Sequence, residues 1–438
     1  MTPKIAVIIF PGTNCEVEAL RALKRSDMDP RIVRWNEKID YSSFDGFFIP
    51  GGFSYEDRGR SGVIASKNPL LEKIKQEANK EKPVLGICNG AQILLEAKLI
   101  PGLSKNNVEM GLAANKRVDK NGNILGTGFY NDWIYIKNTS TPKRSAFNNF
   151  DPEHFMHIPI AHADGRYTTL DKELISVLKK NEQIVFTYCD KNGEVIPEFP
   201  INPNGSIENI AGICNAEGNV MSLMPHPERT ELGQAIFDSM REYLSKSFIL
   251  KRKENSINER KSEITDEIKN YERPQIEIFV DPIITDNEER TLEYAIKQMG
   301  YQQIKLQKQI YFGIETEESL DLKKTAEDLI KSGEVVNLAK EIPTVVINNK
   351  IYTYNKETGL KSIKNQDSSA GNEYISFDKE NIVGDNMLQT IKNHFNMSEI
   401  KNIAYGKKWT LVTEPDIANE IIKTHIFHNP HSMNIYKV

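Results

Sequence analysis

The five residues GICNG, Gly86 to Gly90, place a cysteine between two glycines at the end of the apolar run KPVL. The apolar run predicts a buried strand, and the segment AQILLEAKLI after the turn predicts a helix. A G-x-C-x-G turn between strand and helix is the thiol counterpart of a nucleophile elbow. Such a turn raises its central side chain above the sheet, at a helix N-terminus that favours thiolate. We therefore predict that Cys88 is a nucleophile.

Strand-like and helix-like segments alternate around this turn. Strands are predicted at residues 4–10, 29–35, 44–49 and 82–88, and helices at 15–26, 70–81 and 91–100. In the first helix, Val17, Leu20 and Leu23 share one predicted apolar face. The alternation predicts an α/β fold with a doubly wound, mostly parallel sheet. Later strands at 131–137, 183–189, 210–216 and 220–226 predict a mixed or antiparallel addition.

A nucleophile needs a base and a group that orients it. The sequence MPHPER supplies His226 and Glu228, two residues apart, so their side chains point to the same side of an extended segment. The glutamate can then hold the imidazole tautomer and stabilise its charged form. We predict that Cys88, His226 and Glu228 act together.

Backbone N–H donors for an oxyanion are predicted at two places. Gly51 and Gly52 end the strand at 44–49, and paired glycines let the backbone approach closely. The residue after the nucleophile, Asn89, offers the second N–H.

The composition is typical of a globular protein. The chain has 438 residues, a net charge of -5 and four cysteines without a C-x-x-C pair, so a zinc or disulfide framework is not expected. The pI of about 6.0 gives no global sign of nucleic-acid binding, and neither a membrane span nor a signal peptide is predicted. These features predict a cytoplasmic protein with no metal site, and they assign an ordinary structural role to Cys15, Cys189 and Cys214.

The C-terminal part contains an internal repeat. A charged linker is predicted at 248–273, followed by strand–helix–strand–helix units at 274–348 and 373–438 with a polar insert, a hairpin and a flexible loop at 349–372. A shift of about 96 residues aligns Leu292 with Leu388 and Ile304 with Ile400, and a shift of about 92 aligns Leu329 with Ile421. The histidines near the C-terminus, at 425, 428 and 431, are predicted to lie at a surface or interface and not to bind metal.

The motifs FPGTNCE, GGFSYEDRGRSG, GICNGAQILLEA, IPIAHADGRY and MPHPER make residues 4–232 resemble the glutamine amidotransferase subunit of phosphoribosylformylglycinamidine synthase, the PurQ family. The resemblance implies a class I glutaminase domain over 1–247, with a flavodoxin-like fold. It implies that Cys88, His226 and Glu228 hydrolyse glutamine through a γ-glutamyl thioester, releasing ammonia. Further contacts to glutamine or to a partner are implied for Gly51, Phe53, Gln92 and His162. The segment 108–137 departs from the family pattern, as does Thr187, where a basic residue is common.

The repeat resembles PurS, the small subunit of the same synthase, through MGYQQIK and IKNIAYGKKWTLVTE. This resemblance implies α+β units that bridge the glutaminase to a separate PurL-type synthetase. Since the chain has no P-loop and no long ATP-binding domain, ATP and Mg²⁺ are expected on that partner, and no cofactor is expected on this chain.

Three alternatives remain at this stage. A class I glutaminase of another pathway would share the triad but not the FPGTNCE and SYEDRGRSG segments. A DJ-1-like cysteine sensor or chaperone would share the elbow but would not need MPHPER. The C-terminal third could also be an independent regulatory or small-molecule-binding module.

Overall fold

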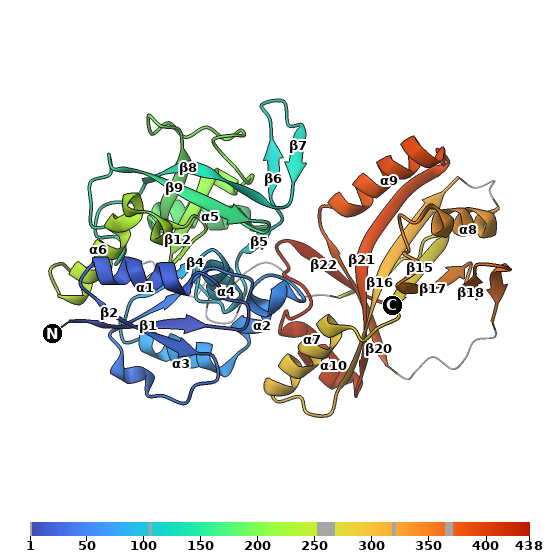
Figure 1. The fold of residues 1–438 in the computed structure, drawn as a ribbon, viewed down its shortest axis with the longest axis horizontal. Coiled ribbons are helices and arrows are strands. Elements are labelled where there is room, and N and C mark those ends of the chain that lie inside the picture. Colours follow the sequence, from blue (N-terminus) through green and yellow to red (C-terminus); the bar gives the residue numbers. More distant parts are fainter. Residues whose placement is uncertain (1, 105–106, 252–267, 318–320, 364–370) are drawn as a thin grey trace. The chain divides into compact units, whose positions relative to one another are not determined.

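The computed structural model describes residues 2–104, 107–251, 268–317, 321–363 and 371–438 (Figure 1). The chain divides into two compact units, Met1–Thr265 and Asp266–Val438. Among the described residues, no helix is long and apolar enough to cross a membrane.

The first unit is built on a nine-stranded sheet in the order β2-β1-β3-β4-β13-β12-β11-β8-β9. Its parallel part comprises β1 (Lys4–Ile9), β2 (Asp29–Arg34), β3 (Gly46–Ile49), β4 (Val84–Ile87) and β13 (Val220–Leu223). Its antiparallel part comprises β12 (Ile210–Cys214), β11 (Ile184–Cys189), β8 (Tyr130–Asn138) and β9 (Phe155–His162). The predicted α/β sheet with an antiparallel addition is therefore present.

Helices cover both faces of the parallel part, with α1 (Glu16–Arg25) and α3 (Pro69–Ala78) on opposite sides (Figure 1). The predicted apolar face of α1 is wrong in part, since Val17 is 47% exposed and the buried residues are Ala19, Ala22 and Leu23. The small side chains of the two alanines let the helix approach the sheet closely. The buried face is therefore the one that packs best against the sheet, not the one with the largest apolar side chains. The remaining helices of the unit are α2 (Val63–Ser66), α4 (Asn89–Glu96), α5 (Lys172–Lys180) and α6 (Gln234–Leu244).

Short strands outside the main sheet complete the unit: β5 (Gly111–Ala113) pairs with β10 (Arg166–Thr168), and β6 (Lys116–Val118) pairs with β7 (Ile124–Thr127). All of these except β10 lie within residues 108–137, the segment that departs from the family pattern.

The second unit is a separate nine-stranded sheet in the order β14-β22-β20-β21-β16-β15-β17-β18-β19. Its first half runs β15 (Ile276–Pro282), α7 (Asn287–Gln298), β16 (Lys305–Thr316), α8 (Leu322–Ser332) and β17 (Glu341–Ile347). Its second half runs β20 (Asn372–Asp378), α9 (Ile382–Phe395), β21 (Ile400–Val412), α10 (Pro415–Lys423) and β22 (Met433–Lys437).

The two halves have the same order of elements and the same strand order, and they join edge to edge. In each half the first strand lies between the second and the third, and β16 pairs antiparallel with β21 across the junction. Two of the pairs aligned by the repeat, Leu329 with Ile421 and Ile304 with Ile400, are buried in both halves, whereas Leu388, aligned with the buried Leu292, is half-buried. Each half therefore buries one helix-covered face of a three-stranded sheet.

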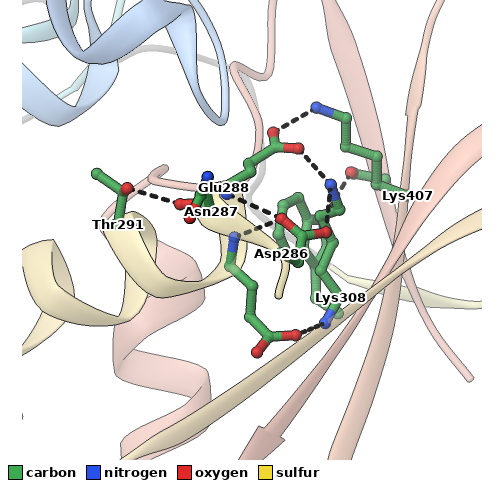
Figure 2. A network of polar contacts seen from close by, with 9 residues as sticks. Asp286, Asn287, Glu288, Thr291, Lys308 and Lys407 are labelled. Carbon is green, nitrogen blue, oxygen red and sulfur yellow. Dashed lines mark hydrogen bonds and ion pairs between the residues drawn. The ribbon is translucent and has the colours of Figure 1, made fainter. Parts of the chain in front are cut away.

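A network of charged side chains links the halves (Figure 2). The buried Nζ of Lys308 on β16 contacts Asp286 Oδ2 at 2.9 Å and Glu288 Oε2 at 2.5 Å. The other oxygen of Glu288 lies 2.6 Å from Nζ of Lys407 on β21. Burial disfavours the charged form of Glu288, but Lys407 and Lys308 lower its pKa to about 2. The carboxylate thus stays charged between the two central strands.

The predicted insert contains the expected hairpin, formed by β18 (Lys350–Asn355) and β19 (Gly359–Ser362). The predicted flexible loop falls largely on residues 364–370, and most of the predicted linker on 252–267, which lie outside the described residues. At the linker's ends, Phe248 and Leu250 are buried in the first unit, while β14 (Lys269–Asn270) pairs with β22 in the second.

The histidines near the C-terminus were predicted to lie at a surface or interface, and the structure contradicts the surface position. His425, His428 and His431 are 4%, 7% and 2% exposed. The rings of His425 and His428 lie 5.0 Å apart.

Candidate active site

Cys88 is the single residue that connects β4 to α4, as the predicted nucleophile elbow requires. Its backbone has φ 51° and ψ −107°, a strained conformation for a residue with a side chain, and its N–H donates to Leu223 O at 2.8 Å. A Cβ at Gly90 would lie 1.9 Å from Ile49 O, and one at Gly86 would lie 2.5 Å from Gly90 O. Both glycines are therefore required by contact with backbone, which explains the G-x-C-x-G pattern.

His226 and Glu228 form a buried pair directly after β13. His226 Nδ1 lies 2.6 Å from Glu228 Oε1, and both residues are at most 2% exposed. The backbone N–H of His226 donates to Pro159 O at 2.9 Å, which fixes the segment against β9. Burial opposes a charged imidazole, but Glu228 and Cys88 raise the pKa of His226 well above its ordinary value. The Glu228 carboxylate and the nearby Cys88 thus favour the charged form of this histidine.

Sheet order brings the nucleophile and this pair together. Because β4 and β13 are parallel neighbours, their carboxyl ends meet at one edge. Gly51, which follows β3, lies beside both residues. A Cβ at this position would lie 2.7 Å from His226 Cε1 and 3.4 Å from Cys88 Cβ. Gly51 therefore acts by the absence of a side chain.

Gly52 lies where an oxyanion donor was predicted. Its φ of 146° is available to glycine and strained for other residues. Gly52 and Thr13 form an isolated antiparallel bridge. The two hydrogen bonds of the bridge run from Phe53 N–H to Gly12 O at 2.9 Å and from Asn14 N–H to Gly51 O at 3.3 Å. The N–H of Gly52 therefore takes no part in the bridge. Ser54 N donates to Asn89 Oδ1 at 3.1 Å, which ties the glycine turn to the residue after the nucleophile.

Three further predicted residues have distinct surroundings. Gln92 is buried, accepts from Asn89 Nδ2 at 2.9 Å and donates to Asp164 O at 2.7 Å. His162 is buried with Nδ1 3.2 Å from Asn115 Oδ1, and burial together with His226 lowers its pKa to about 3. Phe53 is 44% exposed on the glycine turn. Gln92 and His162 are thus held in buried hydrogen bonds, whereas Phe53 is partly exposed to solvent.

The loop after Phe53 is strained and acidic, which sequence reasoning missed. Tyr55, Glu56 and Asp57 have φ of 54°, 58° and 54°, three consecutive non-glycine residues in the left-handed region. Ser61 Oγ donates to Asp164 Oδ2 at 2.7 Å. Burial and the nearby Asp164 raise the pKa of Asp57 to about 7, against a hydrogen bond from Ser61. A carboxyl pair is therefore held beside the Gln92 network.

A second thiol also lies in the site. Cys15, 1% exposed, stands at the start of α1, and its sulfur would lie 3.2 Å from a Cβ at Gly51. Arg229 Nη2 donates to Cys15 Sγ at 3.1 Å. The ordinary structural role predicted for Cys15 is thus too narrow. Its position in FPGTNCE, directly after the first strand, was the available signal, as was Arg229 in MPHPER.

Comparison with known proteins shows the family to which the chain belongs. Residues 2–243 match the family model of the CobB/CobQ-like glutamine amidotransferase domain. The chain belongs to this family. The chain is also similar to the phosphoribosylformylglycinamidine synthase subunit PurQ of Methanothrix thermoacetophila, at 45% identity over 259 residues, 55% of this chain and 98% of the relative. The subunit PurQ of Methanocaldococcus jannaschii is 42% identical over 228 residues, 52% of this chain and 89% of the relative.

The solved structure of PurLQS from Thermotoga maritima is 31% identical to this amidotransferase, covers 56% of the chain and all of the matched chain, and has a TM-score of 0.42. The prediction of an enzyme, a glutamine amidotransferase of the PurQ type, is confirmed by the family model and the curated relatives. The relatives do not support the alternatives of a DJ-1-like sensor or a glutaminase of another pathway.

Proposed function

We propose that Cys88 hydrolyses glutamine through a thioester. The thiolate attacks the γ-carbonyl carbon, and the oxyanion that forms accepts hydrogen bonds from the N–H groups of Gly52 and Asn89. Protonated His226 gives its proton to the departing nitrogen, so that ammonia leaves and a γ-glutamyl thioester remains on Cys88. Neutral His226 then takes a proton from water, which attacks the thioester and releases glutamate.

One observation carries this proposal: the buried His226–Glu228 pair, joined at 2.6 Å, and Cys88 border the same position, since a Cβ at Gly51 would lie 2.7 Å from His226 Cε1 and 3.4 Å from Cys88 Cβ. A carboxylate bound to Nδ1 leaves Nε2 as the nitrogen that exchanges a proton with the sulfur or with the leaving group. Glu228 would orient the ring and stabilise its charge.

The ammonia would pass to a separate synthetase. The relatives are named as subunits of phosphoribosylformylglycinamidine synthase, so this chain would be the glutaminase component in de novo purine biosynthesis. A PurL-type partner would bind ATP, Mg²⁺ and formylglycinamide ribonucleotide, and this chain would carry no cofactor.

The second unit would be the bridge to that partner. Its two halves, paired through β16 and β21, would provide within one chain the PurS-like module that the sequence predicts. An unattached glutaminase would waste glutamine, so activity would depend on assembly.

Glutamate release from glutamine tests these proposals. The rate is measured with and without a PurL-type synthetase, ATP, Mg²⁺ and the ribonucleotide, for the native chain and for Cys88→Ala. Release that rises with the partner and is absent in Cys88→Ala is expected. Undiminished release by Cys88→Ala would overturn the assignment of the nucleophile, and release independent of the partner would overturn the bridging role.

A further inference from the structure

The active site contains a compact set of donors in addition to the cysteine nucleophile. One ligand atom each from Cys15, His226 and Glu228 lies within 4.8 Å of the others. All three residues are at most 2% exposed. They come from two distant parts of the sequence, the start of α1 and the segment after β13, and meet above Gly51.

Two atoms of this set are buried without hydrogen-bond partners among the described residues. They are His226 Nε2 and Glu228 Oε2. A buried carboxylate oxygen and a buried imidazole nitrogen without partners are costly, unless a proton or a cation occupies the space beside them. His226 Nε2 is the nitrogen assigned above to proton exchange with Cys88, so Glu228 Oε2 is the atom whose burial points to a cation beside it.

The donors match the preferences of zinc. Zn²⁺ takes thiolate, imidazole nitrogen and carboxylate oxygen at roughly 2.0–2.3 Å in a tetrahedron. Ligand atoms of such a site lie roughly 3.5 Å apart, so the present spacing needs only small side-chain rotations. A thiolate and a carboxylate together balance the two charges of the ion. Arg229, which donates to Cys15 Sγ at 3.1 Å, would remain as an outer partner of the sulfur ligand.

We propose that Cys15, His226 and Glu228 form a binding site for Zn²⁺ or a similar thiophilic divalent cation, which leaves Cys88 without its base. The ion binds the His226 imidazole or the Glu228 carboxylate that orients it, so His226 no longer transfers protons to and from Cys88. Removal of the ion restores the pair. The inhibition rests on the proposed function, whereas the binding does not.

Binding is measured first, without glutamine. The full chain, kept reduced with a phosphine and freed of metal, is titrated with Co²⁺, and thiolate coordination is read from the near-ultraviolet charge-transfer band. One equivalent of Zn²⁺ should abolish the band. Cys15→Ser should lose the band and bind Zn²⁺ at least tenfold more weakly. Cys189→Ser, which removes a buried thiol on β11, is the matched control and should behave as the native chain.

The activity arm uses glutamate release in the assembled synthase, with each variant compared with its own metal-free rate. Zn²⁺ should inhibit the native chain reversibly, with recovery on adding a chelator, and Cys15→Ser should need at least tenfold more Zn²⁺. Equal affinity in the native chain and Cys15→Ser, or no thiolate band in the native chain, overturns the site. Glu228→Gln keeps the size of the ligand but not its charge, and unchanged Zn²⁺ affinity in that variant would remove Glu228 from the ligand set.

Discussion

Gly51 shows how a position without a side chain can organise an active site. Its missing Cβ leaves room for three neighbours, since a Cβ there would lie 2.7 Å from His226 Cε1, 3.2 Å from Cys15 Sγ and 3.4 Å from Cys88 Cβ. None of these neighbours is backbone, so an added methyl group displaces side chains rather than the sheet.

Gly51→Ala should therefore impair catalysis more than folding. The methyl group pushes the imidazole away from Cys88, and we expect kcat/KM for glutamine to fall at least tenfold, with a destabilisation of about 1–3 kcal/mol, typical of overpacking. Gly90→Ala is the contrast, because its Cβ would lie 1.9 Å from Ile49 O and must move backbone. Thermal unfolding and initial rates of both variants are compared. A fully active Gly51→Ala would show that the contact to His226 has no role in positioning.

Glu228→Gln should change the pH dependence of the reaction. Burial alone would lower the pKa of His226, while Glu228 and Cys88 raise it above its ordinary value of 6.5. Loss of the carboxylate charge lets burial dominate, so the histidine loses its proton at lower pH. We expect the alkaline limb of the kcat/KM profile to move to lower pH, with a rate reduction of about 10²–10⁴-fold. An alkaline limb at the native pH would contradict the role of Glu228.

The placement of Cys88, His226 and Glu228 was predictable because the segments that carry them have local signals. Cys88 is marked by a strand, a turn and a helix in sequence, and His226 and Glu228 are two residues apart. The places of Cys15, Asp57 and Asp164 were not predictable, because they depend on which strands are neighbours. Only the order β1-β3-β4-β13 brings the ends of four separated segments to one edge.

Among the elements, the helices and strands with strong apolar periodicity were predicted, and those fixed by pairing were missed. The strands β15, β16, β20 and β21 were all expected from sequence. The third strand of each half, β17 and β22, was not, because β17 contains Pro343 and β22 has only five residues. Both are strands because they pair along the first strand of their half.

The Glu288 network should make the second unit acid-sensitive. The pKa of Glu288 is lowered from 4.5 to about 2 in the folded state, so its contribution to stability is present above pH 4.5 and is lost as pH falls through 2. That contribution is at most about 3.5 kcal/mol, since one pKa unit corresponds to about 1.4 kcal/mol. Glu288→Gln should reduce the loss of stability over this range.

Hydrogen exchange of peptides from β16 and β21 is the direct measurement, because these strands carry Lys308 and Lys407. Native peptides should lose protection between about pH 4.5 and 2, and those of Glu288→Gln should already be less protected at neutral pH and change less with acid. Lys297→Gln, which removes an ion pair on the partly exposed surface of α7, is the control and should follow the native curve. Equal acid sensitivity in native and Glu288→Gln chains would show that the network does not hold the central strands.

The chain joins two units whose relation to known proteins differs. The Methanothrix relative is matched over 98% of its length by 55% of this chain, so the first unit corresponds to a protein that is a separate chain elsewhere. Most of its buried apolar side chains form one cluster, with residues between Ile5 and Leu250. The first unit should therefore fold without the second.

Removal of the second unit separates chemistry from assembly. A chain ending at Lys251 should keep the fold and the triad, so a glutamine-like electrophile should still label Cys88 and the Cys88→Ala form should stay unlabelled. Stimulation of glutamate release by the PurL-type synthetase should fall at least tenfold, because the proposed bridge is gone. Adding the separate second unit, residues 266–438, should restore part of it. Full stimulation of the shortened chain would place the synthetase contact on the first unit alone, and loss of Cys88 labelling would show that the second unit supports the triad.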